Sequence, residues 1–286
     1  MSSFQRWVLV VPCVVLLMLH KVAAAAEPLV MGVLPRVDAM ESSRMFQPLA
    51  QYLSEAIGQP VVLEIPKDFE AFSRALADKR FDIVHLNQYQ YLKANKEQGY
   101  LVIAKNIEQG SDTLAAAIVV RGDSKAKSLA DLKGNKIIFG GDRTAMQAYV
   151  GTTYLLRRAG LKRGDYVEVF AKTPPNAVLA TFYKQADAAG AGDRVLKIPS
   201  VAKQIDVRQM RFLAVGDSLP HLPWAVKGTM TRDLRTKIQL AMLGLNKSDE
   251  GRALLKRAGF DGFSIASNSD YDRHRIIIRE VLGEKY

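Results

Sequence analysis

The sequence predicts an α/β protein whose strands run mostly parallel. Short apolar runs rich in β-branched residues alternate with segments in which apolar residues recur every three or four positions. The connections are short, as in βαβ units. The 286 residues are 48% hydrophobic and 24% charged. This is ordinary globular usage, sufficient for one large domain or for two lobes of about 100 residues each.

The first part of the chain shows this alternation clearly. The apolar run 29–34 is a predicted strand that ends at Pro35, and Gly58 stops the helix that follows it. Asp68 is placed to cap the next helix. The predicted strands are 29–34, 61–65 and 82–86, and the predicted helices carry Met45 to Ile57, Phe69 to Leu76 and Tyr89 to Gln98.

The second part repeats the pattern and ends in helices. Pro174 and Pro175 suit a first helical turn, whose N–H groups lack partners anyway. Ser248 followed by two acids suits another helix start. The predicted strands are 115–121, 136–140, 166–170, 187–192 and 211–215, and the predicted helices are 142–160, 174–184, 231–243, 248–258 and 270–282.

The first 26 residues have the features of a secretory signal peptide. Arg6 precedes the apolar run 7–19, and an alanine-rich segment precedes Glu27. A membrane span needs about 20 apolar residues, so this run, which also contains Pro12, is too short. Removing residues 1–26 leaves 38 basic and 29 acidic residues, a formal charge of +9, and removes Cys13, the single cysteine. Thiol catalysis, disulfides and cysteine-based zinc sites are therefore excluded from the mature chain.

The basic residues do not cluster as they do in nucleic-acid-binding proteins. They are dispersed among acids, and the densest groups are as short as Arg157-Arg158. We therefore expect a solvated surface biased toward anionic ligands or lipid headgroups, and no nucleic-acid partner.

Four segments resemble one family. LVMGVLP at 29–35 resembles its opening strand, and FQPLAQYL at 46–53 resembles the helix that follows. DIVHLNQYQY at 82–91 and SLADLKG at 128–134, the latter followed by IIFG, resemble two further motifs. In this order and spacing, over nearly all of 29–282, the chain resembles the phosphate/phosphite/phosphonate-type periplasmic substrate-binding proteins of ABC transporters.

The resemblance implies a two-lobed periplasmic-binding-protein fold of type II, with parallel-rich sheets flanked by helices and a discontinuous first lobe. We place the first lobe at 27–112 and 217–286 and the second at 113–216. Such a protein would close on a small anionic ligand in the periplasm and deliver it to a membrane permease, as a monomer and without a cofactor. Two alternatives stay open: a sensory module that signals to a membrane kinase, and an exported enzyme of the same shape.

Anions bind where helix N-termini follow the carboxyl ends of parallel strands, and two such junctions lie in the predicted first lobe. Arg36 follows the first strand and could present its guanidinium to an oxyanion, although it could equally be an exposed loop residue. Asn87, Gln88 and Tyr89 follow the strand 82–86, where they could bind oxygens or simply cap and pack a helix.

A third junction, 141–146, corresponds to a Ser-Thr-Ser-Gly run that cradles the anion in the phosphonate binders. Here Thr144 keeps a hydroxyl beside Ala145, and Arg143 adds a guanidinium; Thr144 could instead be only an N-cap. The weaker candidates are Thr113 at the first crossing between lobes, Asn176 at a helix start, and Asp193, where the family often has an acid that holds an amine or a protonated oxygen.

The sequence contains no familiar catalytic motif. Gly-x-Ser-x-Gly, His-Glu-x-x-His and the Walker A loop are all absent. His85, His221 and His274 are far apart in sequence and form no metal-ligand spacing. We therefore expect a binding protein with no catalytic residues and no metal, and expect His85 and His221 to be structural.

Overall fold

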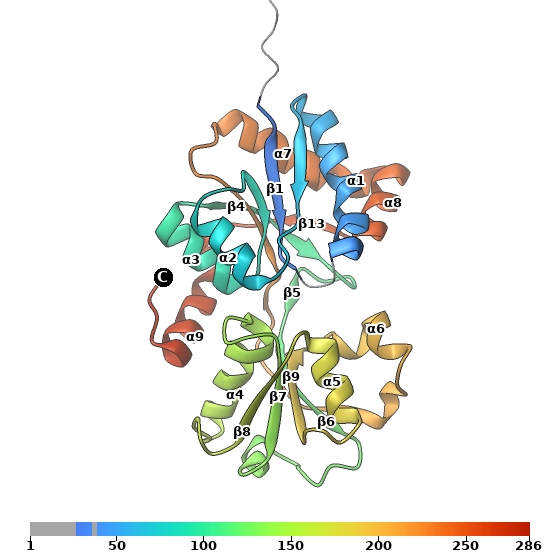
Figure 1. The fold of residues 1–286 in the computed structure, drawn as a ribbon, viewed down its shortest axis with the longest axis vertical. Coiled ribbons are helices and arrows are strands. Elements are labelled where there is room, and N and C mark those ends of the chain that lie inside the picture. The colour runs from blue at the N-terminus through green and yellow to red at the C-terminus, as the bar shows by residue number, and fades with distance from the viewer. Residues whose placement is uncertain (1–26, 36–38) are drawn as a thin grey trace, which may run out of the picture.

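The computed structural model describes residues 27–35 and 39–286, which form two lobes joined at a narrow waist (Figure 1). The predicted signal peptide and Arg36 lie outside these residues. Each lobe contains one sheet with helices on its faces, as the α/β prediction requires. Within the described residues, no helix is both long enough and apolar enough to cross a membrane.

The sheet of the first lobe has six strands in the order β13-β4-β12-β3-β1-β2. The strands β1, β2 and β3 are parallel, whereas β4, β12 and β13 pair antiparallel. The bounds are β1 Leu29–Val33, β2 Val61–Glu64, β3 Ile83–His85, β4 Leu101–Ile107, β12 Pro223–Val226 and β13 Gly262–Ile265.

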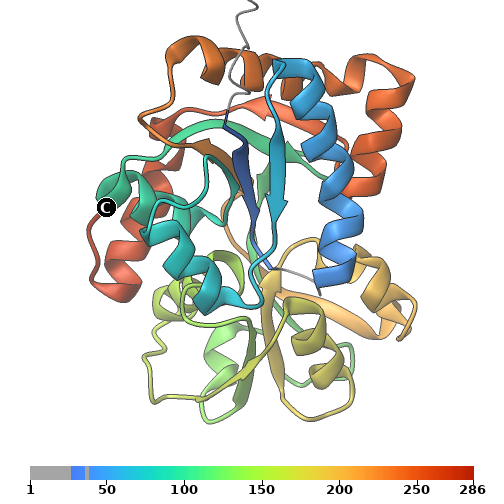
Figure 2. The ribbon, with the colours of Figure 1, turned by 45° about the horizontal axis from the view of Figure 1, so that its top comes forward.

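Two layers of helices cover this sheet. One layer packs around the buried Phe46 and Leu49, and α1 lies beside α7 and α8 in it (Figure 2). The other layer contains α2, α3 and α9. The bounds are α1 Ala39–Ile57, α2 Phe69–Ala77, α3 Gln88–Gln98, α7 Arg232–Gly244, α8 Asp249–Ala258 and α9 Asp272–Leu282.

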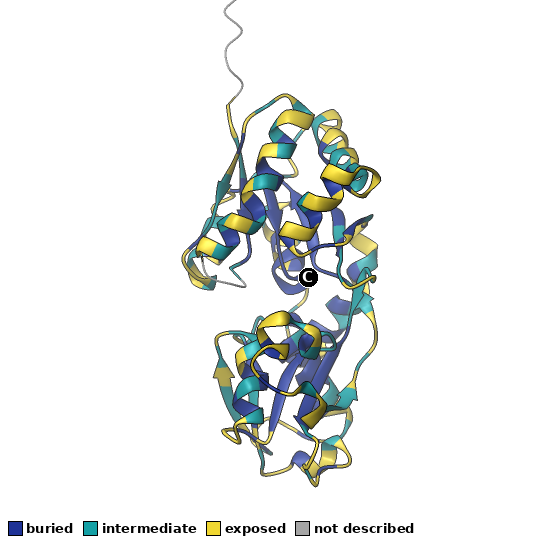
Figure 3. Cartoon of the chain, turned by 90° about the vertical axis from the view of Figure 1, so that its right-hand side faces the viewer, coloured by how far each residue is buried: buried dark blue, intermediate teal, exposed yellow. Residues whose placement is uncertain are grey.

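The sheet of the second lobe has five strands in the order β10-β6-β9-β7-β8. Its inner strands are buried, and its helices expose their outer faces (Figure 3). The strands β7, β8 and β9 are parallel, and β6 is antiparallel to β9 and β10. The bounds are β6 Ala116–Arg121, β7 Lys136–Gly140, β8 Val167–Ala171, β9 Ala188–Gly192, β10 Met210–Val215, α4 Thr152–Arg158, α5 Pro174–Phe182 and α6 Pro199–Ala202.

The chain passes between the lobes twice. The short strands β5 (Thr113–Leu114) and β11 (Leu219–Pro220) pair antiparallel at the waist. Some strands of the first sheet precede those of the second sheet in the sequence, and others follow them. The first lobe is therefore discontinuous. The helix α9 lies against both α3 and α4, and one apolar cluster runs from Leu92 through Ile278 to Tyr149. The lobes therefore share buried apolar contacts through α9.

Three strands of the first sheet and one helical irregularity differ from the sequence expectations. The strands β4, β12 and β13 were not predicted, and all three are antiparallel. The predicted helix 142–160 begins as a π-helical turn over Met146–Gly151 and becomes α-helical only at Thr152. This turn packs closely on the sheet, since a Cβ on Gly190 would come within 2.3 Å of the Ala148 carbonyl oxygen.

Candidate functional site

The carboxyl ends of the parallel strands of both lobes meet at the waist. In the first lobe these are the ends of β1 and β3, and in the second those of β7, β8 and β9. The Nδ2 of Asn87, just after β3, donates to the carbonyl oxygen of Thr144, just after β7, at 3.3 Å. This contact joins two of the three predicted junctions across the lobes. We call Asn87, Thr144 and its neighbour Asp142 the interlobe site.

Asn87 has two structural tasks in this site. Its Oδ1 accepts from the backbone N–H of Gln90 at 2.8 Å, and the Gln90 side chain accepts from the Asn87 N–H, which makes a capping box. The side-chain nitrogen of Asn87 takes no part in the cap and donates instead to Thr144 of the second lobe. Of the two roles that the sequence left open for Asn87, the structure shows the helix cap, and the same side chain also reaches the other lobe.

Gln88 and Tyr89 lie against other parts of the structure. The Nε2 of Gln88 donates to the carbonyl oxygen of Pro220 in β11 at 2.9 Å. The Tyr89 hydroxyl donates to Glu284 at 2.8 Å and contacts Tyr286, so it holds the C-terminal tail. Burial raises the pKa of Tyr89 to about 12. Of this predicted trio, the structure brings only Asn87 to the interlobe site.

The loop after β7 holds an internal carboxylate. The Oδ1 of Asp142 accepts from the Thr144 N–H at 2.8 Å and from the Thr144 hydroxyl at 2.6 Å. The N–H of Ala145 donates to the Asp142 carbonyl oxygen at 3.1 Å. These are donors of the kind that an oxyanion would use. The Asp142 side chain therefore occupies hydrogen-bond donors expected to serve a ligand.

Close packing fixes this loop beside the start of α5. A Cβ on Gly140 would lie 2.2 Å from the Cα of Pro174, and Gly141 has a φ of +114°. Only glycine suits both conditions, so the sequence Gly140-Gly141 allows the loop to turn against α5. Asn176 lies in the first turn of α5, where its N–H donates to the capping hydroxyl of Thr173 at 3.4 Å.

The Arg143 guanidinium is engaged within its own lobe. Its Nη2 pairs with Glu168 at 2.8 Å, and its guanidinium lies 5.7 Å from the ring centres of Tyr149 and Phe170. Glu168 pairs with Ile137, near the amino end of β8, whereas the interlobe site lies at the carboxyl end. The guanidinium predicted to bind an anion is therefore already paired.

Thr113 and Asp193 belong to the hinge. The Thr113 hydroxyl lies 3.0 Å from the hydroxyls of both Ser111 and Ser218, which come from the two crossing segments. The Asp193 carboxylate accepts from the Ala115 N–H at 3.2 Å, and the Asp193 N–H donates to the Ala115 carbonyl oxygen at 2.9 Å. Asp193 thus connects the end of β9 to the first crossing.

A buried polar network under the first sheet's carboxyl edge was missed by the sequence analysis. Trp224 Nε1 donates to Asn106 Oδ1 at 2.8 Å, and Asn106 Nδ2 lies 3.1 Å from His85 Nε2 and 2.8 Å from Glu108 Oε1. His221 Nε2 lies 3.8 Å from Glu108 Oε2. These residues come from three separate segments, and Asn106 lies on the unpredicted strand β4, so no local pattern could group them.

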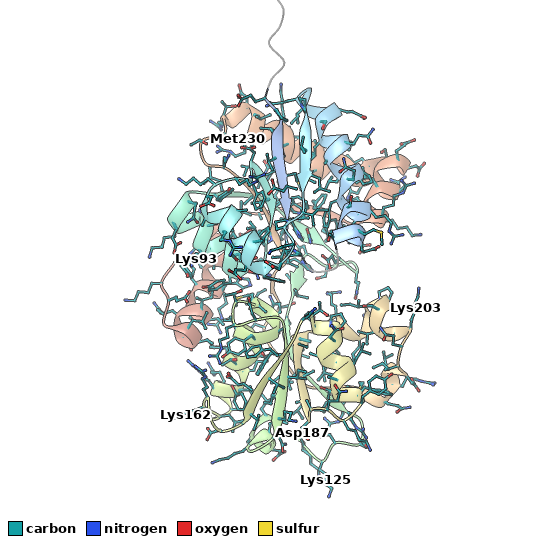
Figure 4. All side chains as sticks on the ribbon, viewed as in Figure 1. Lys93, Lys125, Lys162, Asp187, Lys203 and Met230 are labelled. Carbon is teal, nitrogen blue, oxygen red and sulfur yellow. The ribbon has the colours of Figure 1, made fainter. Side chains whose placement is uncertain are left out.

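Several basic side chains lie away from this site. The labelled lysines Lys93, Lys125, Lys162 and Lys203 lie at the outer surface of the molecule (Figure 4). Within residues 27–35 and 39–286, no three His, Cys, Asp or Glu side chains are grouped closely enough to hold a metal ion. The site is thus a set of amide, hydroxyl and carboxylate groups between two lobes.

Several solved structures share this fold. The structure of a binding protein component of an ABC phosphonate transporter from Pseudomonas aeruginosa matches with a TM-score of 0.76 at 14% identity, over 89% of this chain and 86% of that one. PhnD1 of Prochlorococcus marinus in complex with methylphosphonate matches with a TM-score of 0.78 at 16% identity, over 90% and 99%. A Xanthomonas citri protein bound to ATP matches with a TM-score of 0.74 at 16% identity, over 90% and 97%. At these identities the matches establish the fold.

The family assignment rests on the sequence. The model of the family described as "ABC transporter, phosphonate, periplasmic substrate-binding protein" matches residues 31–271, which is most of the chain. The match spans both sheets, both crossings and the interlobe site. The chain therefore belongs to the phosphonate periplasmic substrate-binding proteins of ABC transporters.

Proposed function

We propose that this protein captures a small oxyanion, such as a phosphonate, phosphate or related organic acid, between its lobes and delivers it to a membrane permease. The observation that supports this most directly is the family match over 31–271. It is joined by the Asn87–Thr144 contact, which brings two strand ends together across the lobes. We further propose a periplasmic location, a monomeric state and no catalysis.

Binding would use groups that the structure already holds in place. Asn87 Nδ2, the Thr144 N–H and the Thr144 hydroxyl are three donors within one contact region. An oxyanion that accepts from Thr144 would replace the Asp142 carboxylate and leave it to turn into solvent. The liganded lobes would then close about the waist strands, and the permease would recognise the closed form.

Arg36 is the guanidinium that we propose for charge complementation. In the sequence it follows β1, and β1 ends at the same edge of the sheet as its parallel neighbour β3, which precedes Asn87. Thr113, Asn176 and Asp193 would shape the walls and the hinge. Gln88, Tyr89 and Arg143 would act indirectly, because their polar groups are engaged elsewhere.

Calorimetric titration of purified, ligand-free protein tests the proposal. Phosphate, phosphite, methylphosphonate, methanesulfonate and acetate should be compared, and at least one should bind. Thr144→Ala should weaken the best ligand about tenfold, the effect of losing one good hydrogen bond to a charged group.

Thr231→Ala is the matched control, since it removes the same hydroxyl group from the start of α7, outside the interlobe site. It should leave affinity unchanged. Absence of heat with every oxyanion, or equal loss in the two variants, would contradict the proposed function.

A further inference from the structure

A cavity of about 260 Å³ lies beside the waist, on a different set of residues from the interlobe site. Its walls come from the π-helical turn and α4, from the start of β6, from the second crossing segment, and from α9. Asn87, Asp142 and Thr144 do not line it. The volume is about eight to nine times the roughly 30 Å³ that one water molecule occupies in the liquid. It can therefore hold a small organic molecule.

The polar side of this cavity has an excess of positive charge. Arg273 Nη2 donates to the Tyr154 hydroxyl at 3.1 Å, and Arg158 Nη1 does so at 3.4 Å. Asp217 pairs with Arg273 at 3.2 Å. Among the residues that the structure describes, no carboxylate lies within ion-pair distance of Arg158. Two guanidinium groups thus face one carboxylate, which leaves a local charge of about +1.

A further donor in the same wall has no partner. The Nε2 of Gln147 is buried and makes no hydrogen bond within the described part of the chain. A buried N–H group without an acceptor costs free energy, on the order of 1–3 kcal/mol. Gln147 also lines the cavity, so a rotation of its side chain would bring this amide to an acceptor held inside. The polar wall therefore offers donors from Gln147 and Arg158 and needs a single negative charge.

Other lining residues are apolar. Met146, Leu155, Leu219 and Ile277 line the cavity, from the helix, the second crossing and α9. An apolar body placed against them would gain roughly 25 cal/mol for each Å² removed from water. A bare inorganic anion would gain nothing from these side chains, and a dianion would exceed the available charge beside Asp217.

We propose that this cavity is a second ligand site, which binds a small monocarboxylate with an apolar body. The carboxylate accepts from Arg158 and Gln147, and the body packs on the wall of Met146, Leu155, Leu219 and Ile277. The occupant touches both lobes.

The helix α9 is tied to α4 by Arg157, which donates to the Glu280 carbonyl and, at 2.9 Å, to that of Val281. The tail beyond α9 is tied to α3 through Tyr89.

Titration with hexanoate tests this site, with hexan-1-ol and hexylamine as probes of the same body without the negative charge. Hexanoate should bind the purified protein, and its affinity should exceed that of either comparator at least tenfold. Arg158→Gln should weaken hexanoate at least tenfold, since a hydrogen bond to a charged group contributes about 1.5–3 kcal/mol.

The control is Arg257→Gln, which removes the same charge from the exposed last turn of α8 and should change nothing. Arg158→Glu should reverse the preference, so that hexylamine binds better than hexanoate. Thr144→Ala should leave hexanoate binding intact, which separates this site from the proposed transport site. No binding of hexanoate to the wild-type protein, or equal affinity in the Arg158→Gln and Arg257→Gln variants, would overturn the proposal.

Discussion

His274 provides a quantitative test of how burial controls stability. Its side chain is completely buried in α9, and neither ring nitrogen has a hydrogen-bond partner among the described residues. Burial, aided by the charge of Arg275, lowers the pKa of His274 from 6.5 to about 3. Between these two values the unfolded chain binds a proton that the folded chain does not. Stability from this group is complete above pH 6.5 and is lost as the pH falls toward 3.

The expected loss is about 1.4 kcal/mol for each pH unit below 6.5, or about 2 kcal/mol between pH 7 and pH 5. Urea unfolding of the wild type and of His274→Leu should be compared at pH 7, 6 and 5. Leucine cannot titrate, so the variant should gain about 2 kcal/mol relative to the wild type over this range. Taking the difference cancels the contributions of the other titrating groups.

Two results would refute this reasoning. The first is a pair of parallel stability curves, which would mean that His274 does not contribute to the pH dependence. The second is an NMR titration of the folded wild type in which the His274 imidazole gains its proton near pH 6. The NMR measurement needs no variant, so the test holds even if His274→Leu folds poorly.

Three further substitutions probe the interlobe site and its support. Asp142→Asn should strengthen oxyanion binding about tenfold in calorimetry, since it removes a like charge while keeping an acceptor for Thr144; unchanged or weaker binding would contradict the internal-carboxylate interpretation. Asn87→Ala should lower the free energy of unfolding in urea by about 1 kcal/mol through loss of the α3 cap, and an unaltered midpoint would show that the cap contributes nothing. Trp224→Phe should cost at least about 1–3 kcal/mol in thermal unfolding followed by circular dichroism, because the buried Asn106 Oδ1 loses its donor; full wild-type stability would rule out that network as a stabilising element.

Local signals made the parallel strands and their helices predictable. The runs at 29–34, 61–65, 82–86 and 136–140 are apolar, and each is followed by a helix start. The hydrophobic pattern and the helix-start residues therefore indicate the same strand-to-helix order. The antiparallel strands of the first sheet lack that support. The strand β12 is only four residues long and opens with Pro223, and its partners β3 and β4 are distant in sequence. Its place is set by tertiary pairing, which local propensity does not encode.

The candidate site shows the same division between local and distant causes. Asn87 as a cap could be predicted, because a cap depends on residues within one turn. The hydroxyl of Tyr89 is directed by Glu284, which is 195 positions away, and Arg143 is directed by Glu168 on a neighbouring strand. A side chain beside a strand end can point to the ligand or back into its own lobe. The local sequence predicts where such a side chain lies along the chain, but it does not predict the direction in which the side chain points.

This distinction bears on how an anion would be recognised. Of the residues predicted to bind it, Arg143 carries the positive charge in the second lobe, and its guanidinium is paired with Glu168. Asp142, which was not predicted as a site residue, places a carboxylate where the anion would accept from Thr144. The described part of the interlobe site is therefore rich in donors and carries a negative charge. The proposed function assigns the positive charge to Arg36, so Arg36→Gln should abolish oxyanion binding in calorimetry, whereas Arg143→Gln should leave it intact.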